Sequence, residues 1–166
     1  MERTYLFRKA EKQEVPMVFD LIMRRVAWMD QVGIRQWNTT KYDECYPQEY
    51  YEKRRQKDEL FVLEERPSGC LVCVGALFHE DARWPDPESA YYLHHLASAV
   101  DAKGVGSIFL QEAEKYTKKQ GKTYLRLDSA VGNTVLEEYY TSRGYVEAGR
   151  CIDRLYKGIL RQKKLV

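Results

Sequence analysis

Two glycines stand directly before a helical pattern in the middle of the chain. The stretch AVDAKGVGSIFLQEAEKY places Gly104 and Gly106 after a strand-like run and at the start of a helix. The first N–H groups of a helix have no partner within it, and the helix dipole adds positive charge there, so these amides can bind an anion. Lys103 adds a further positive charge. The segment predicts either a phosphate-binding loop or a tight turn from strand to helix.

Two well-known phosphate loops do not fit this segment. A dinucleotide-binding fingerprint requires a third glycine where Phe109 stands, and it belongs near the start of a parallel βαβ series. A Walker loop requires Gly-Lys-Ser/Thr at a spacing that the sequence does not have. A tight turn from strand to helix and a phosphate-binding loop of another kind therefore both remain possible interpretations.

The cysteines give little support for a metal site. Cys70 and Cys73 form a CxxC pair in CLVCVGALF, but alternation along a strand would send the two thiols to opposite faces of a sheet. No second Cys or His pair accompanies them, so we expect small buried side chains and no metal. Four scattered cysteines are also too few for a secreted disulfide framework, which predicts a cytoplasmic protein.

Charge and hydropathy exclude two further classes of partner. The net charge of +2, from 27 basic and 25 acidic residues, provides no long-range field that would select nucleic acid. No window approaches the roughly 18 consecutive apolar residues of a membrane span. We therefore expect neither a nucleic-acid nor a membrane partner.

Hydrophobic periodicity predicts a single mixed α/β domain over residues 1–166. The antiparallel first half is followed by a strand-helix-strand crossover, and helices cover both faces of the sheet. Strands are predicted at 5–8, 59–65, 70–78, 90–98, 122–128, 145–150 and 152–160, and helices at 12–30, after Pro47, at 105–120 and at 133–143.

Roughly the last 75 residues resemble the GNAT superfamily of acetyl-CoA-dependent N-acetyltransferases. The similar stretches are YYLHHLAS, KGVGS and LDSAVGNTVLEEYYTSRGY. GNAT enzymes carry an Arg/Gln-x-x-Gly-x-Gly/Ala loop for the CoA diphosphate, which Gly104-Val105-Gly106 fits. The first position is Asp101, whose carboxylate would repel a phosphate at close range. The resemblance implies a GNAT-type α/β fold, with a mixed central sheet, an antiparallel N-terminal half and splayed middle strands.

The same resemblance implies acetyl-CoA as cosubstrate and a set of residues that bind it. The backbone of the strand end would pair with the pantetheine as with an added strand. Asn133 would bond the pantetheine or nucleotide arm. The implied cofactor-binding residues are Leu96, Ala97, Ser98, Lys103, Gly104, Val105, Gly106, Ser107 and Asn133.

A tyrosine and a histidine are the predicted catalytic pair. By the resemblance Tyr139 packs inward and Tyr140 faces the sulfur, where a protonated phenol can donate to the departing thiolate. In a chain with 13 tyrosines, simple packing is the alternative. The acceptor amine must lose a proton, and His94 is the candidate base, with a packed structural histidine as the alternative. Strand alternation lets only one of His94 and His95 face the cleft, and His79 or Glu80 could replace it.

The first helix and the loop after it are predicted to form the acceptor wall. Trp28, Trp37 and Tyr42 are the candidate substrate-binding residues, able to hold a cationic amine by their ring faces, although such rings often serve as core. The acceptor would be a small-molecule or peptide amine, and the resemblance suggests a homodimer. The predicted function is transfer of acetyl to an amine by direct attack in a ternary complex. The alternative is a non-catalytic acyl-CoA sensor or interaction module, which Asp101 favours.

Overall fold

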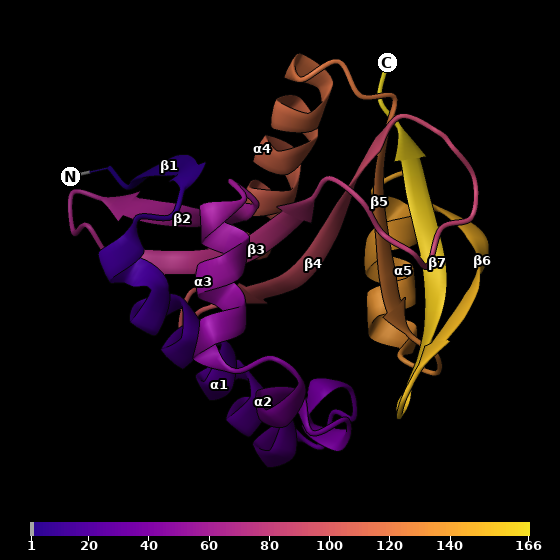
Figure 1. The fold of residues 1–166 in the computed structure, drawn as a ribbon. Helices are drawn as coiled ribbons and strands as arrows, with labels where there is room; N and C mark the ends of the chain where they lie inside the picture. Colours follow the sequence, from indigo (N-terminus) through magenta and orange to yellow (C-terminus); the bar gives the residue numbers. More distant parts are fainter. Residues whose placement is uncertain (1) are drawn as a thin grey trace.

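A single seven-stranded sheet organises the computed structural model, which describes residues 2–166. The strand order is β1-β2-β3-β4-β5-β7-β6, and every neighbouring pair except β4 and β5 is antiparallel. Figure 1 shows helices on both sides of this sheet. The expected α/β architecture, with an antiparallel N-terminal half, is confirmed. The strands are β1 (Thr4–Lys9), β2 (Leu60–Arg66), β3 (Leu71–Phe78), β4 (Ala90–Ser98), β5 (Tyr124–Ala130), β6 (Val146–Asp153) and β7 (Tyr156–Lys164).

Two long helical segments cover one face of the N-terminal half. Helix α1 (Val15–Val32) tolerates Pro16 in its first turn, where no intrahelical hydrogen bond is lost. Helix α3 (Gln48–Gln56) follows Pro47, as predicted. Both helices pack on alternate residues of β2 and β3, which form a buried cluster with them. The cluster includes Val18, Ile22, Tyr51, Leu60, Val62 and Val74.

The opposite face is covered by α4 (Val105–Lys119) and α5 (Thr134–Ser142). Their buried side chains join the other alternate residues of β2 and β3 in a second cluster, which includes Phe61, Leu63, Cys73, Phe109 and Tyr140. A Cβ added to Gly75 in β3 would lie 2.8 Å from the Phe109 ring. The glycine therefore lets α4 approach the sheet closely.

Strands β4 and β5 stay together only at one end. They pair in parallel over Ala90–Tyr92 and Tyr124–Arg126, and then diverge, as Figure 1 shows. On its β5 side, the rest of β4 has no ladder partner among the described strands. The sheet thus opens in its middle, as the resemblance implied.

Three short helices and one turn differ from the sequence prediction. The segments η1 (Lys12–Glu14), η2 (Trp37–Thr39) and α2 (Tyr42–Cys45) were not expected as separate elements. The break between the last two strands was placed at Cys151, which is wrong. Strand β6 continues to Asp153, and the chain turns at Arg154, which has a positive φ of 56°.

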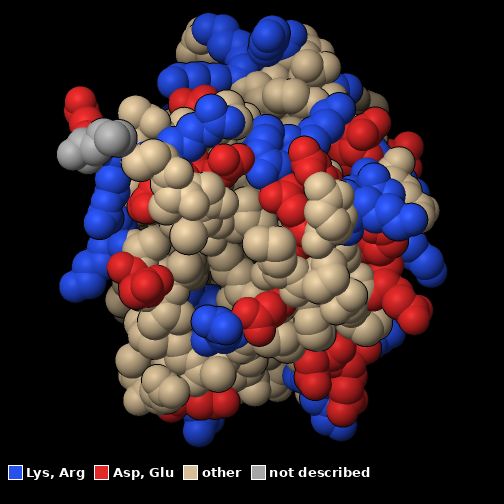
Figure 2. Space-filling view, turned by 90° about the vertical axis from the view of Figure 1, so that its left-hand side faces the viewer, with Lys and Arg blue, Asp and Glu red and all other residues tan. Residues whose placement is uncertain are grey.

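Basic and acidic residues both occur on the face of the molecule seen in Figure 2, so neither sign of charge covers it alone. Among residues 2–166, no helix is both long enough and apolar enough to cross a membrane. All four cysteines are free thiols. Cys73 is buried, as expected for a small apolar side chain, but Cys70 is exposed, so the expectation of burial is wrong for Cys70, which lies just before β3.

Candidate active site

A cleft of about 610 Å³ lies where β4 and β5 diverge. Its walls come from the end of β4, the N-termini of α4 and α5, the C-terminal part of α1 with the segment after it, and the turn between β6 and β7. Nearly all predicted site residues line this cleft. They are Trp28, Trp37, Tyr42, His94, Leu96, Ala97, Ser98, Gly104, Gly106, Ser107, Asn133 and Tyr140.

The N-terminus of α4 faces the cleft with open amides. Gly104 adopts a φ of 80°, and no side chain among the described residues caps the helix. A Cβ on Gly104 would meet nothing within 4 Å, so the space beside this backbone is empty. Val105 instead packs in the core, while Asp101 and Lys103 are exposed outside the cleft lining. The uncapped N–H groups can therefore donate hydrogen bonds to an anion that the Asp101 side chain does not contact.

The start of α5 differs, because a side chain caps it. Asn133 Oδ1 accepts a hydrogen bond of 3.1 Å from the N–H of Leu136. Its amide nitrogen remains available to a ligand in the cleft. Arg143, which sequence reasoning missed, places its guanidinium 3.6 Å above the Tyr139 ring and also lines the cleft.

The end of β4 is less open than the resemblance implied. Both Nε and Nη2 of Arg25 donate to the carbonyl of Ser98, at 3.0 and 2.7 Å, and Nη2 also donates to the Ser98 hydroxyl. The prediction that this strand end offers free carbonyls is therefore wrong for Ser98. These hydrogen bonds tie α1 to the strand, and Arg25 also stacks on Trp28 of the same helix, at 4.4 Å from the ring centre.

The two adjacent tyrosines of α5 both line the cleft, and the inner one is Tyr140. This residue is 7% exposed, whereas Tyr139 is half-buried beneath Arg143. The expectation that Tyr139 is the inward-packed tyrosine is therefore wrong, because Tyr140 is the more buried of the two. Burial is the main cause that raises the pKa of Tyr140 well above 10, so the phenol stays protonated.

Both histidines of β4 line the cleft, so the prediction that only one could is wrong. His95 has a positive φ of 59°, and the β3–β4 register shifts beside Gly75. Two residues of β4 therefore oppose one of β3, and this bulge interrupts the alternation of side chains. His95 is buried, with Nδ1 bonded to the Tyr42 hydroxyl and Nε2 at 2.9 Å from the Tyr50 hydroxyl.

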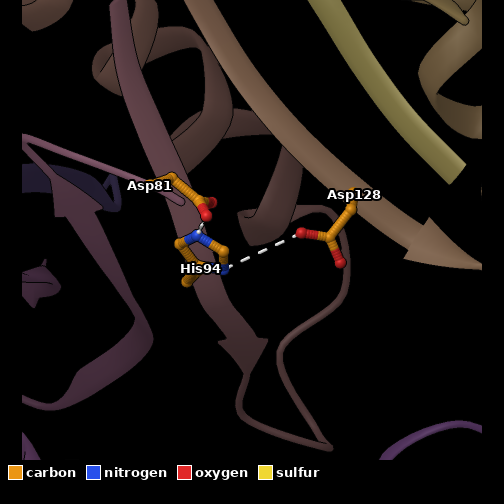
Figure 3. Close-up of side chains that lie close together, drawn as sticks. All are labelled: Asp81, His94 and Asp128. Carbon is orange, nitrogen blue, oxygen red and sulfur yellow. Dashed lines mark hydrogen bonds and ion pairs between the residues drawn. The ribbon is translucent and has the colours of Figure 1, made fainter. Parts of the chain in front are cut away.

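His94 lies between two carboxylates that sequence reasoning missed. Its Nε2 is 2.7 Å from Oδ2 of Asp81, and its Nδ1 is 3.9 Å from Oδ1 of Asp128 (Figure 3). Asp128 ends the motif LRLD, which identified the strand but no role for the carboxylate. Asp81 follows His79 and Glu80, both of which are exposed. Neither of these two alternative bases lines the cleft.

These three residues are the only group within residues 2–166 whose donor atoms lie close enough to hold a metal ion, all within 4.8 Å. However, Nη1 of Arg83 donates to Oδ1 of Asp128 at 3.0 Å. A metal ligated by that oxygen would face a guanidinium at close range, which opposes cation binding. The arrangement suits a proton better than a metal.

Aromatic side chains form the wall opposite α5. Trp37 stacks on Tyr42 with ring centres 4.6 Å apart, and Tyr46 packs against Tyr42 at 4.9 Å. Trp28 and Met29 extend the wall along α1. The segment between α1 and α3 thus holds its rings at the cleft, as predicted for the acceptor side.

Comparison with known proteins shows the family of the chain and its fold. Residues 29–145 match the family model described as the acetyltransferase (GNAT) family. A GNAT-family acetyltransferase from Listeria monocytogenes 4b F2365 has a similar structure, with 22% identity, a TM-score of 0.81, and 97% of this chain and 95% of that chain covered. The PaiA N-acetyltransferase of Thermoplasma acidophilum, in complex with coenzyme A, is 19% identical, with a TM-score of 0.73 and coverage of 97% and 99%.

A third similar structure is a GNAT-family acetyltransferase from Streptococcus agalactiae 2603, with 21% identity, a TM-score of 0.78 and coverage of 96% and 95%. No curated protein matches the chain by sequence. At these identities the structures share the fold, whereas the family model covers most of the sequence. The chain therefore belongs to the GNAT family of acetyltransferases.

Proposed function

We propose that this protein transfers an acetyl group from acetyl-CoA to an amine acceptor, by direct attack within a ternary complex. The observation that carries the proposal is a single cleft lined by the uncapped start of α4, the open side of β4 and the hydroxyl-bearing Tyr140. The first feature suits a diphosphate, the second a pantetheine arm, and the third a thiolate that must gain a proton.

The cosubstrate would be held mainly by backbone. The amides at Gly104, Gly106 and Ser107 would bind the diphosphate, with no charged side chain required between them and the ligand. Leu96 and Ala97 would pair with the pantetheine along the open side of β4, while Arg25 occupies the Ser98 carbonyl. The free amide nitrogen of Asn133 would donate to the arm of CoA.

The chemical step needs one acid and one base on opposite sides of the thioester. Tyr140 is the acid, because burial keeps its phenol protonated until the sulfur departs. His94 is the base, because it can accept a proton on the side of the cleft that Asp128 lines. A free cysteine nucleophile is unnecessary, since burial raises the pKa of Cys73 well above its usual value and leaves a protonated thiol.

The acceptor would lie against the aromatic wall of Trp28, Trp37 and Tyr42. Ring faces together with the carboxylate of Asp128 favour a small-molecule or peptide amine that arrives as a cation. The base must then remove a proton from that cation before attack.

A thiol-release assay tests the proposal. The protein is incubated with acetyl-CoA and a panel of amines, and free CoA is titrated with a thiol reagent. We expect amine-dependent release of CoA. Binding of acetyl-CoA without release by any amine would instead support the acyl-CoA sensor. Failure to bind CoA at all would contradict both functions.

A further inference from the structure

His94 lies between the large cleft and a second cavity, and Tyr46, Arg83, His95 and Asp153 also line both spaces. This cavity has a volume of about 240 Å³ and is lined by Tyr46, Tyr50, Phe78, Asp81 and Arg83, with both histidines. His94 lines both spaces. Asp128 lines only the large cleft, and Asp81 lines only the second cavity. The imidazole therefore has one carboxylate on each side, in two different compartments.

Asp81 fixes the orientation and tautomer of this imidazole. Its Oδ2 accepts from Nε2–H of His94 at 2.7 Å, so the neutral ring carries its lone pair on Nδ1. The 3.9 Å from Nδ1 to Asp128 is too long for a hydrogen bond, which leaves that lone pair available on the cleft side. Figure 3 shows the ring between the two carboxylates.

Asp128 is held in place as an anion by other partners. Arg83 Nη1 donates to its Oδ1, and the Tyr156 hydroxyl donates to its Oδ2. Its side chain is 8% exposed. With both oxygens occupied, Asp128 is poorly placed to take a proton but well placed to stabilise a positive charge on His94.

We propose that Asp81 is a positioning residue that also carries the proton away: the acceptor amine gives its proton to Nδ1 of His94, and Nε2–H passes to Asp81 and then to water in the second cavity. This inference rests on the proposed function. As the N–C bond forms, the C–S bond breaks, and the thiolate takes its proton from Tyr140. The nitrogen then loses its second proton to solvent, and the tyrosinate regains one from solvent. Each turnover thus converts an ammonium and acetyl-CoA into an amide, free CoA and the one proton that leaves through His94.

The remaining groups around His94 leave this path open. His95 on the same strand is bonded to two tyrosines, and burial holds its pKa well below 6.5, so it stays neutral. Arg83 is paired with Asp128 and with Asp153 of β6, at 3.0 and 2.9 Å. Tyr46 and Tyr50 from the α2–α3 side have pKa values raised chiefly by burial, and so do not compete as bases.

The local charge keeps Asp81 ionised between turnovers. Burial alone would raise the pKa of Asp81, but the hydrogen bond and charge of His94 bring it below its usual value. A carboxylate of low pKa is a weak base, so it holds the proton from His94 only briefly and gives it readily to water. Asp81 thus returns to its charged form after each turnover.

Asp81→Asn tests the proposal in the full chain. Asparagine can still accept from Nε2–H and so keeps the tautomer, but it cannot take the proton. We expect kcat to fall about 10- to 100-fold while KM for acetyl-CoA stays within about twofold. The low-pH limb of the kcat profile should move to lower pH, because the imidazolium loses a neighbouring negative charge. Unchanged kcat across the pH range would overturn the proposal.

Asp81→Ala with added formate separates proton transfer from structure. The second cavity can admit a small carboxylate, so formate should restore at least part of the lost kcat. Glu88→Gln is the matched control, since it removes the same charge from an exposed position in the same loop. It should keep wild-type kcat and show no response to formate. Loss of activity in Asp81→Ala without formate rescue would mean that Asp81 has only a structural role.

Nitrogen NMR of the His94 ring provides a readout that needs no substrate. Long-range ¹H–¹⁵N spectra should show the Nε2–H tautomer in the wild type, and a lower protonation midpoint in Asp81→Asn. The opposite tautomer would refute the relay even if transfer is observed. Absence of CoA release by the wild type with the expected tautomer would instead refute the proposed function.

Discussion

At the scale of single residues, Tyr140 combines burial with access to the cleft. Its ring packs among Tyr139, Tyr145 and the core residues of α4, so its position is fixed. Removal from water disfavours the phenolate, which raises the pKa. A phenol of this kind is a poor base and a suitable donor to a leaving group whose charge appears only during reaction.

Tyr140→Phe should therefore lower kcat by about 10²- to 10³-fold, with KM for acetyl-CoA nearly unchanged. The ring remains, so the fold and the cofactor site should persist. Because the phenol is protonated throughout about pH 6–9, the fold-decrease in kcat should be the same at every pH in that range. Steady-state thiol release checks this. A decrease in kcat confined to high pH would mean that the phenolate, and not the phenol, is the form that acts in catalysis.

Local patterns predicted those site residues whose role depends on nearby backbone. Gly104 and Gly106 were identifiable because they stand at the start of a helix, whereas Asn133 was identified through the resemblance to the GNAT superfamily. Asp81 was not identifiable, because its contact with His94 depends on how a loop of 11 residues folds back on the sheet. The bulge at His95 reversed an alternation that sequence alone could only assume.

At the scale of elements, the contact between β3 and α4 sets the position of the uncapped start of α4. The missing side chain of Gly75 makes room for Phe109, which is 0% exposed. Helices α1, α3, α4 and α5 were predictable from their apolar spacing and flanking residues. The segment 34–46 was not, because α2 starts from Lys41 at a positive φ of 53° and has only four residues.

Gly75→Ala should destabilise the fold by about 1–3 kcal/mol, because the new methyl overlaps the Phe109 ring. Urea unfolding measures the change. When Phe109→Leu is added, the double variant should lose less free energy of unfolding than the sum of the two single losses, since the smaller side chain relieves the overlap. Strict additivity of the two free-energy changes would contradict the close contact.

The loop between β3 and β4, which carries Asp81 and Arg83, is fixed by an ion pair. Arg126 of β5 is buried, donates to both oxygens of Asp86 at 2.7 and 3.0 Å, and stacks at 4.3 Å from the Trp84 ring. The hydrogen bonds from Arg126 lower the pKa of Asp86 below 3.8.

Asp86→Asn should lower the Tm at neutral pH, because Arg126 loses its anionic partner. A carboxyl with a lowered folded-state pKa stabilises the fold above pH 3.8 and loses that effect as pH falls further. The Tm difference between wild type and variant should therefore be full near neutrality and shrink below pH 3.8. Calorimetry at several pH values checks this. A pH-independent difference would mean that the charge of Asp86 is unimportant.

At the scale of the whole molecule, the two halves of the sheet share only three residue pairs between β4 and β5. Arg83 adds a bridge from the N-terminal half to Asp128 and Asp153. A CoA in the cleft would contact β4 on one side and α5 on the other, across this opening. Cosubstrate binding should therefore stabilise the entire fold.

Saturating CoA, at 100 times its Kd, should stabilise the protein by about 2.7 kcal/mol, or about 5–10 °C in Tm. Gly104→Ala and Gly121→Ala form a matched pair, because both glycines have a φ near 80° and empty space where a Cβ would lie. Each should lower the Tm of the free protein similarly, through the cost of a left-handed alanine, about 1–2 kcal/mol. Only Gly104 lines the cleft, so only its substitution should also reduce the CoA-induced rise in Tm. Equal rises in both variants would place the diphosphate away from the start of α4, because a methyl at Gly104 would then not meet it.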